Sequence, residues 1–227
     1  MIGKGKSISH GVAALEYDLA KEINGQAVAT EIARHELYGC TGAEMVQEMK
    51  PYHIDFPNVK NNCLRFEVSP SIEESATFTD ADWAELGNDF MQRMGLANHQ
   101  YIIIRHSGTE SKKEQAHLHI LANRVSLSGE LYRDNWIGKK ATEAANAIAK
   151  ERNFVQSQDI GKVNKAEIKE AMDGVLKKMQ GFDFTKFKEE LGKRGFKVRE
   201  ARASTGKLNG YYVTARSGTE YKASEIG

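Results

Sequence analysis

The clearest pattern of hydrophobic and polar positions lies between residues 101 and 125. An apolar run rich in β-branched residues, Tyr101 to Ile104, predicts a buried strand that ends at His106. The polar stretch 107–115 predicts a loop, and the partial alternation over 116–125 predicts a second strand. Together these segments predict a β-hairpin.

This hairpin would bring three histidines together. Side chains alternate along a strand, so His117, His119 and Asn123 share one face while apolar residues occupy the other. His106 ends the first strand and should lie near the start of the second. Three neutral imidazoles from two neighbouring strands can bind a divalent metal and leave positions open for water or substrate, which is typical of a catalytic site.

An earlier segment, residues 11–23, has the spacing of a helix. Tyr17 and Lys21 fall on the side opposite its apolar stripe, where an aromatic residue is either simply exposed or functional. The predicted core face consists of Val12, Leu15, Leu19 and Ile23.

The remaining periodic segments predict both helices and strands. Residues 63–70 alternate, with Leu64, Phe66 and Val68 on one face of a strand and Arg65 and Glu67 on the other. The N-terminal stretch 1–9 suggests an edge strand. Further helices are expected over 42–52, 80–95, 137–153, 164–179 and 182–195, and further strands over 196–202 and 208–216.

Composition and charge limit the classes of protein to which this chain can belong. A chain of 227 residues with 40% hydrophobic content can bury a sizeable core. The formal charge is only +1, but residues 139–227 carry 19 Lys and Arg against 12 Asp and Glu, so the rest of the chain is acidic. Such a basic third can follow a phosphate backbone, although charged helices are as often plain solvated faces.

Several other classes find no support in the sequence. No apolar run reaches a membrane span and the first residues lack a signal-peptide core, so a cytosolic protein without membrane insertion is expected. Cys40 and Cys63 have no CxxC spacing and are interpreted as reduced thiols. Neither a P-loop nor a GxGxxG motif occurs.

The histidine motif resembles that of a known family. His106, followed by His117-Leu118-His119-Ile120 and Asn123-Arg124-Val125, looks like the three-histidine motif of the HUH-type relaxases, the mobilisation nucleases of conjugative and mobilisable elements. In the single-tyrosine members a nucleophilic tyrosine on an early helix is followed by a lysine, and Tyr17-Asp18-Leu19-Ala20-Lys21 is similar. Among the other tyrosines only Tyr38 is a near rival.

This resemblance implies an α+β fold with a central antiparallel β-sheet and packed helices, as in HUH endonucleases. Residues 1–154 would form the catalytic core with the tyrosine helix and the metal site. Residues 155–227 would form a basic annex of helices and a β-hairpin that contacts DNA as part of the same nuclease domain. Because relaxases commonly continue past this region, we expect a truncated nuclease domain.

The resemblance also implies a reaction. Tyr17 would nick one strand at the origin of transfer by metal-dependent transesterification, with Lys21 favouring the phenolate and Glu67 as an acid in the site. His106, His117 and His119 would hold the metal. The family implies Mg²⁺ or Mn²⁺, whereas three imidazoles by their ligand chemistry suit Zn²⁺, Mn²⁺ or Ni²⁺ better than Mg²⁺.

One departure from the family concerns the acidic residue that supports the metal site. In the family it usually stands two positions after the first histidine. Here that position is Gly108, and the acids near it are Glu110 and Glu114, which leaves the acid open. The expected partners are single-stranded DNA of the origin of transfer, accessory relaxosome proteins and a coupling protein. Residues expected to contact DNA are Lys4, Lys6, Asn123, Arg124, Lys193, Arg194 and Lys197, although Asn123 could instead orient a ligand and Arg124 could pair with an acidic neighbour.

Other functions compete with this interpretation. A rolling-circle replication initiator would share the chemistry and differ in its DNA site. A nucleotide hydrolase can also carry HxH on a strand, with a histidine as the nucleophile. A DNA-binding module without catalytic activity would need neither the tyrosine nor the metal.

Overall fold

The computed structural model describes residues 1–108 and 115–227. Its internal packing divides the chain into two units, Met1–Ser157 and Gln158–Gly227. In neither described range is there a helix that is both long and apolar enough to cross a membrane.

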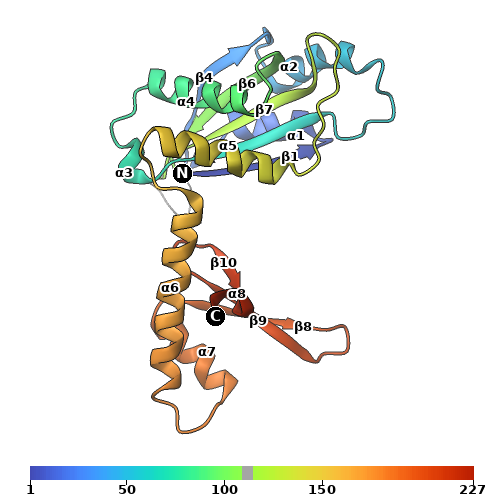
Figure 1. Cartoon of the computed structure of the whole chain (residues 1–227). Coiled ribbons are helices and arrows are strands. Elements are labelled where there is room, and N and C mark those ends of the chain that lie inside the picture. The colour runs from blue at the N-terminus through green and yellow to red at the C-terminus, as the bar shows by residue number, and fades with distance from the viewer. Residues whose placement is uncertain (109–114) are drawn as a thin grey trace. The chain divides into compact units, whose positions relative to one another are not determined.

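A sheet at the centre of the first unit carries the histidines. In the described residues it has five antiparallel strands: β1 (Ile2–Ile8), β4 (Ala29–His35), β5 (Cys63–Ser69), β6 (His99–His106) and β7 (His117–Ser126). Their order is β1-β5-β7-β6-β4, so the predicted N-terminal edge strand is confirmed (Figure 1). The predicted hairpin is confirmed as β6 and β7, with His106 opposite His117.

Helices cover both faces of this sheet. On one face, Phe66 of β5 and Ile120 of β7 pack against α4 (Asp80–Arg93) and α5 (Ile137–Glu151) in the larger core cluster. On the other face, Leu121 packs with α1 (Gly11–Leu19) and α2 (Gly42–Met49) in a second cluster. His117 and His119 share the face of Leu121, because residues two apart on a strand point the same way. The first unit is thus the expected α+β fold.

The helix that carries Tyr17 is shorter than predicted. It ends at Leu19, and a small ribbon of β2 (Glu22–Ile23) and β3 (Gln26–Ala27) follows. Asn24 and Gly25 both have positive φ, at 53° and 74°, which is the conformation of a tight hairpin turn and incompatible with a continuing helix. This Asn-Gly pair was the signal that could have marked the boundary.

The buried face of α1 also differs from the prediction. Val12 is 39% exposed, whereas the buried residues are Gly11, Ala14, Leu15 and Asp18. The apolar stripe was misassigned because an aspartate was not expected to face the sheet. Asp18 is buried there because it has an ionic partner on β5, the side chain of Arg65.

Two further elements of the first unit were not predicted. β4 lacks a strong alternation and pairs along β6 with a bulge between Glu31 and Ala33. The short helix α3 (Ile72–Ser75) is capped by Ser71 and Glu74. The predicted helix over 42–52 is present as α2 followed by a 3₁₀ turn, η1 (Lys50–His53).

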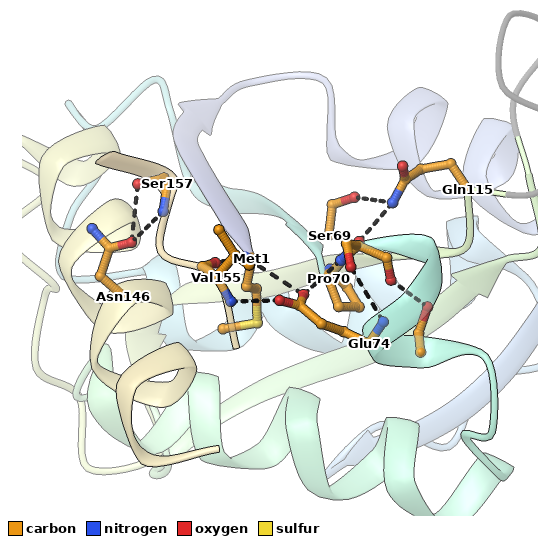
Figure 2. A network of polar contacts seen from close by, with 10 residues as sticks. Met1, Ser69, Pro70, Glu74, Gln115, Asn146, Val155 and Ser157 are labelled. Atoms are coloured by element: carbon orange, nitrogen blue, oxygen red, sulfur yellow. Dashed lines mark hydrogen bonds and ion pairs between the residues drawn. The ribbon is translucent and has the colours of Figure 1, made fainter. Parts of the chain in front are cut away.

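A polar network joins α3, the first residue and the segment after α5 (Figure 2). The carboxylate of Glu74 accepts a hydrogen bond from the Val155 N–H at 2.6 Å and pairs with the amino group of Met1 at 3.6 Å. At the other end of this network, Nε2 of Gln115 donates to the Pro70 carbonyl at 2.6 Å. Gln115 lies two residues before His117, so this contact anchors the start of the histidine strand to the end of β5.

The second unit has its own hydrophobic core. It contains α6 (Ser157–Leu176), α7 (Phe184–Lys193) and, in its described residues, a three-stranded sheet in the order β10-β9-β8. The strands β8 (Lys197–Arg202) and β9 (Leu208–Thr214) correspond to the predicted pair, whereas β10 (Glu220–Lys222) and α8 (Ala223–Ile226) were not predicted. Ile168, Phe187 and Val213 are buried between the helices and the sheet.

Candidate active site and metal centre

The three histidines converge at one end of the hairpin. His106 ends β6, and the ladder places it opposite His117, the first residue of β7, with His119 two residues further on. One candidate ligand nitrogen from each residue lies within 4.8 Å of the other two. The ring centroid of His119 lies 4.4 Å from that of His106 and 4.9 Å from that of His117.

The nitrogens of this cluster fit a single metal ion. Nε2 of His117 and Nε2 of His119 are 3.1 Å apart, about the separation of two imidazole nitrogens that each lie ~2.1 Å from one ion. Nδ1 of His117 lies 3.0 Å from the Gln115 carbonyl, which can only accept, so Nδ1 carries the proton and Nε2 keeps its lone pair. Because Gln115 is anchored to Pro70 and Ser69, this ring orientation is held by the fold (Figure 2).

The protonation of the cluster also favours metal binding. The pKa of His119 is lowered to about 2, mainly by burial and in addition by the neighbouring His106 and His117. Burial is also the main reason why the pKa of His106 lies below its ordinary value. A metal ligand must be a neutral imidazole rather than an imidazolium, so neither ring has to lose its positive charge at neutral pH before it binds a divalent ion.

Tyr17 lies on the exposed side of α1. Its side chain is 57% exposed, and its hydroxyl accepts a hydrogen bond from Nζ of Lys21 at 2.7 Å. The same ammonium group lies 4.8 Å from the centre of the tyrosine ring. The pair expected from the sequence is therefore in contact, although Lys21 follows the helix rather than belonging to it.

Asp18 links the tyrosine helix to the histidines, although it is not among the site residues expected from the sequence. Nε2 of His106 donates to the Asp18 backbone carbonyl at 2.7 Å. The Asp18 carboxylate forms a two-pronged ion pair with the guanidinium of Arg65 and lies 3.8 Å from Nδ1 of His119. Its partner Arg65 lies 47 positions away in the sequence, so no local pattern marks Asp18.

Glu67 faces the same side of the sheet as His119, which it opposes across β5 and β7. Its carboxylate is about a third exposed and pairs with Nζ of Lys4 at 2.9 Å. A cavity of about 210 Å³ lies at this place, lined by Lys4, Gly5, Lys6, Arg65, Phe66, Glu67 and His119. The structure thus brings two of the expected DNA contacts, Lys4 and Lys6, to a hollow beside the histidines.

Asn123 and Arg124 lie elsewhere. Asn123 is fully buried; its amide donates to Gln100 and its carbonyl oxygen contacts His53. This burial corrects the expectation that Asn123 contacts DNA. Arg124 binds Asp134 at 2.7 Å and donates to two backbone carbonyls, so the alternative of an acidic neighbour is the one observed.

The other expected residues are also outside the cluster. Lys193, Arg194 and Lys197 belong to the second unit, where the first two line an open cavity of about 980 Å³. Tyr38 is 76% exposed and its hydroxyl donates to Glu36. Glu110 and Glu114 lie outside the described residues.

Comparison with known protein families shows which family the sequence around this site matches. The family model for the nuclease domain of MobA/VirD2-like relaxases matches residues 17–154, from Tyr17 through the histidine hairpin. No curated protein sequence matches the chain.

Among solved structures, the chain is similar to the conjugative relaxase TrwC in complex with oriT DNA. The metal-bound structure is 12% identical, with 91% of this chain and 74% of that chain covered and a TM-score of 0.40. The metal-free structure is 10% identical, with the same coverage and the same TM-score. Since the family match spans well over half of the sequence, this chain belongs to the MobA/VirD2-like relaxases, as a nuclease domain of that family.

Proposed function

We propose that this protein is a DNA relaxase that nicks one strand at the origin of transfer of a mobilisable element. The observation that carries the proposal is the connection between Tyr17 and the histidines. The exposed tyrosine stands on α1, and the next residue, Asp18, contacts His106 through its backbone. A nucleophile and a metal centre are thereby joined by one short piece of chain.

The reaction is a transesterification. Tyr17 Oη attacks the scissile phosphorus, the bond from phosphorus to the 3′ oxygen breaks, and a 5′-phosphotyrosine forms. The phenol loses its proton and the 3′ oxygen takes one up, so a free 3′-hydroxyl results. The phosphodiester energy is kept in the protein–DNA bond, which permits rejoining of the strand after transfer.

The residues around Tyr17 have distinct roles in this proposal. A phenol has an ordinary pKa of about 10, so it needs help to act as a nucleophile at neutral pH. The ammonium of Lys21, 2.7 Å from the hydroxyl, favours the phenolate. A divalent ion held by His106, His117 and His119 would polarise the scissile phosphate and stabilise its developing charge. Mg²⁺ and Mn²⁺ are the ions that the family implies, while the imidazole set also suits Zn²⁺ and Ni²⁺.

DNA would reach this centre along basic surfaces. Lys4 and Lys6 line the cavity beside His119, where they can hold a phosphate next to the scissile one. In the second unit, Lys193, Arg194 and Lys197 are proposed to contact a neighbouring part of the DNA. The protein is proposed to act in the bacterial cytoplasm, together with accessory relaxosome proteins and a coupling protein. Glu67 is proposed as an acid of the site that acts on the DNA side, through its pair with Lys4, and not on the metal ligands.

A covalent adduct between the protein and DNA would be the decisive evidence for this function. The protein is incubated with single-stranded DNA from the element's own transfer region and Mn²⁺, then resolved on a denaturing gel. An adduct is expected that disappears in EDTA and in Tyr17→Phe, while Tyr38→Phe, a matched change at another exposed tyrosine, retains it. An adduct that survives Tyr17→Phe and disappears with Tyr38→Phe would move the nucleophile.

The same assay separates the competing functions. A histidine-nucleophile hydrolase would tolerate Tyr17→Phe and EDTA but lose activity with His117→Ala. A DNA-binding module would hold the DNA equally well in EDTA and form no adduct. A rolling-circle initiator would form the same adduct at a replication origin rather than at a transfer origin.

A further inference from the structure

We propose that Asp18 is the carboxylate that positions His119 as a metal ligand, in the place where the family motif leaves the supporting acid open. This inference rests on the proposed function only for its metal centre. It would make the residue after the nucleophile part of the metal site.

The burial of Asp18 is the first observation. Its side chain is 2% exposed, and an isolated carboxylate is costly at such a place unless a charge compensates it. Arg65 supplies that charge: its Nε donates to Oδ2 at 3.0 Å and its Nη2 donates to Oδ1. A purely structural ion pair would need nothing more. The Asp18–Arg65 pair, however, lies beside His119, a candidate metal ligand.

The second observation is the hydrogen bonding of His119. Its Nδ1 lies 3.3 Å from Nη2 of Arg65, and its Nε2 lies 3.1 Å from Nε2 of His117. A guanidinium can only donate, so here Nδ1 keeps its lone pair and Nε2 carries the proton, directed at His117. To offer Nε2 to a metal, His119 must carry its proton on Nδ1 instead.

That tautomer needs an acceptor beside Nδ1. Arg65 has no lone pair to offer, whereas Oδ1 of Asp18 lies 3.8 Å from Nδ1. A small shift of the ring toward Asp18 would form the bond. Carboxylates that accept a hydrogen bond from a ligating histidine fix its tautomer and its orientation.

Asp18 acts on a second ligand as well. Its backbone carbonyl accepts the proton of Nε2 of His106, which leaves Nδ1 of that ring with its lone pair. One residue therefore controls the tautomers of two of the three histidines. Because α1 holds this residue, the position of the helix that bears Tyr17 is coupled to the order of the metal ligands.

Glu67 is the rival for this role. It also faces the histidine side of the sheet, but its carboxylate is 35% exposed and engaged by Lys4. No hydrogen bond joins it to His119 among the described residues. Burial and distance both favour Asp18.

Metal affinity of the full chain tests the proposal without any DNA. Mn²⁺ binding is measured by calorimetry and Co²⁺ binding by the visible ligand-field spectrum. Asp18→Asn is expected to weaken Mn²⁺ binding about 10- to 100-fold and to alter the Co²⁺ spectrum. Glu67→Gln, the same carboxylate-to-amide change on the same face, should leave both unchanged.

The variant Arg65→Met distinguishes a role of Asp18 in positioning His119 from a purely structural role in the ion pair with Arg65. If Asp18 matters only as half of an ion pair, removing either partner should weaken the metal site equally, and that result would overturn the proposal. If Asp18 positions His119, Arg65→Met should retain Mn²⁺ affinity. Wild-type affinity in Asp18→Asn, or an equal loss in Glu67→Gln, would also overturn it.

Folding of the variants is checked by thermal unfolding. Should Asp18→Asn fail to fold, the double variant Asp18→Leu/Arg65→Met removes both charges and is compared with Arg65→Met by the same criteria. The adduct assay decides the proposed function separately. A protein that forms the adduct while Asp18→Asn binds Mn²⁺ normally would retain its function and lose this inference.

Discussion

The backbone carbonyl of Asp18 accepts a hydrogen bond from Nε2 of His106 at 2.7 Å, so the residue after Tyr17 touches the first histidine of the cluster. These two residues are 88 positions apart in the chain. The contact joins the end of α1 to the end of β6. Changes in the tyrosine helix should therefore affect the metal ligands.

Lys21 should assist the nucleophile through its charge. Its Nζ donates to the Tyr17 hydroxyl at 2.7 Å, and hydrogen bonds of charged groups contribute roughly 1.5–3 kcal/mol. Lys21→Met is therefore expected to slow adduct formation about 10- to 100-fold at pH 7. The deficit should shrink at pH 9, where more of the phenol ionises unaided.

Single-turnover rates at the two pH values measure this effect. Lys139→Met, at an exposed position of α5, serves as the matched control and should keep the wild-type rate. An equal deficit at both pH values would argue that Lys21 acts on DNA binding or structure rather than on the phenol.

The stability of the metal-free protein should fall in acid because of His119. Its pKa is lowered to about 2 by burial, whereas in the unfolded chain it is about 6.5. The unfolded state therefore binds the proton first: the stability is present in full above pH ~6.5 and is lost progressively as pH falls toward the folded value. The loss is roughly 1.4 kcal/mol per pH unit for this group.

Urea unfolding in EDTA between pH 7 and pH 5 checks this prediction. His119→Gln cannot titrate and should show a shallower decline than the wild type. The same slope in both proteins would contradict the assignment of the acid sensitivity to His119.

Asn123 should contribute to the stability of the fold rather than to DNA binding. Its amide donates to Oε1 of Gln100 at 2.9 Å and its oxygen accepts from the Val125 N–H at 3.0 Å, with no exposure to solvent. Asn123→Ala leaves these buried partners unpaired, which costs about 1–3 kcal/mol for each group. We expect a lower unfolding midpoint in urea and unchanged DNA affinity of the folded fraction. A loss of DNA affinity at full stability would restore the original expectation.

The basic residues of the second unit should strengthen DNA binding without taking part in the reaction. Neutralising Lys193, Arg194 and Lys197 together should weaken binding of origin DNA and reduce its dependence on salt, because fewer phosphates are neutralised. Fluorescence anisotropy across a salt series measures both quantities. Unchanged affinity at low salt would count against these contacts.

The sequence by itself determined the hairpin, the convergence of the three histidines and the family. These features follow from local patterns: the period-2 alternation that sets the faces of β7 and the apolar run that marks β6. The pairing of Tyr17 with Lys21 is local as well, since the two residues are four positions apart. Local patterns also predicted the helix over 137–153, which is present as α5.

Only the tertiary structure decided how α1 sits on the sheet. The buried face of a helix depends on what it packs against, and Arg65 of β5 makes the polar Asp18 a buried residue in place of Val12. The same holds for Asn123, whose partners on β6 and η1 come from distant segments. Long-range pairing of polar groups leaves no periodic trace in a sequence, so the place of Asp18 beside His119 became visible only when the helix and the sheet were seen together.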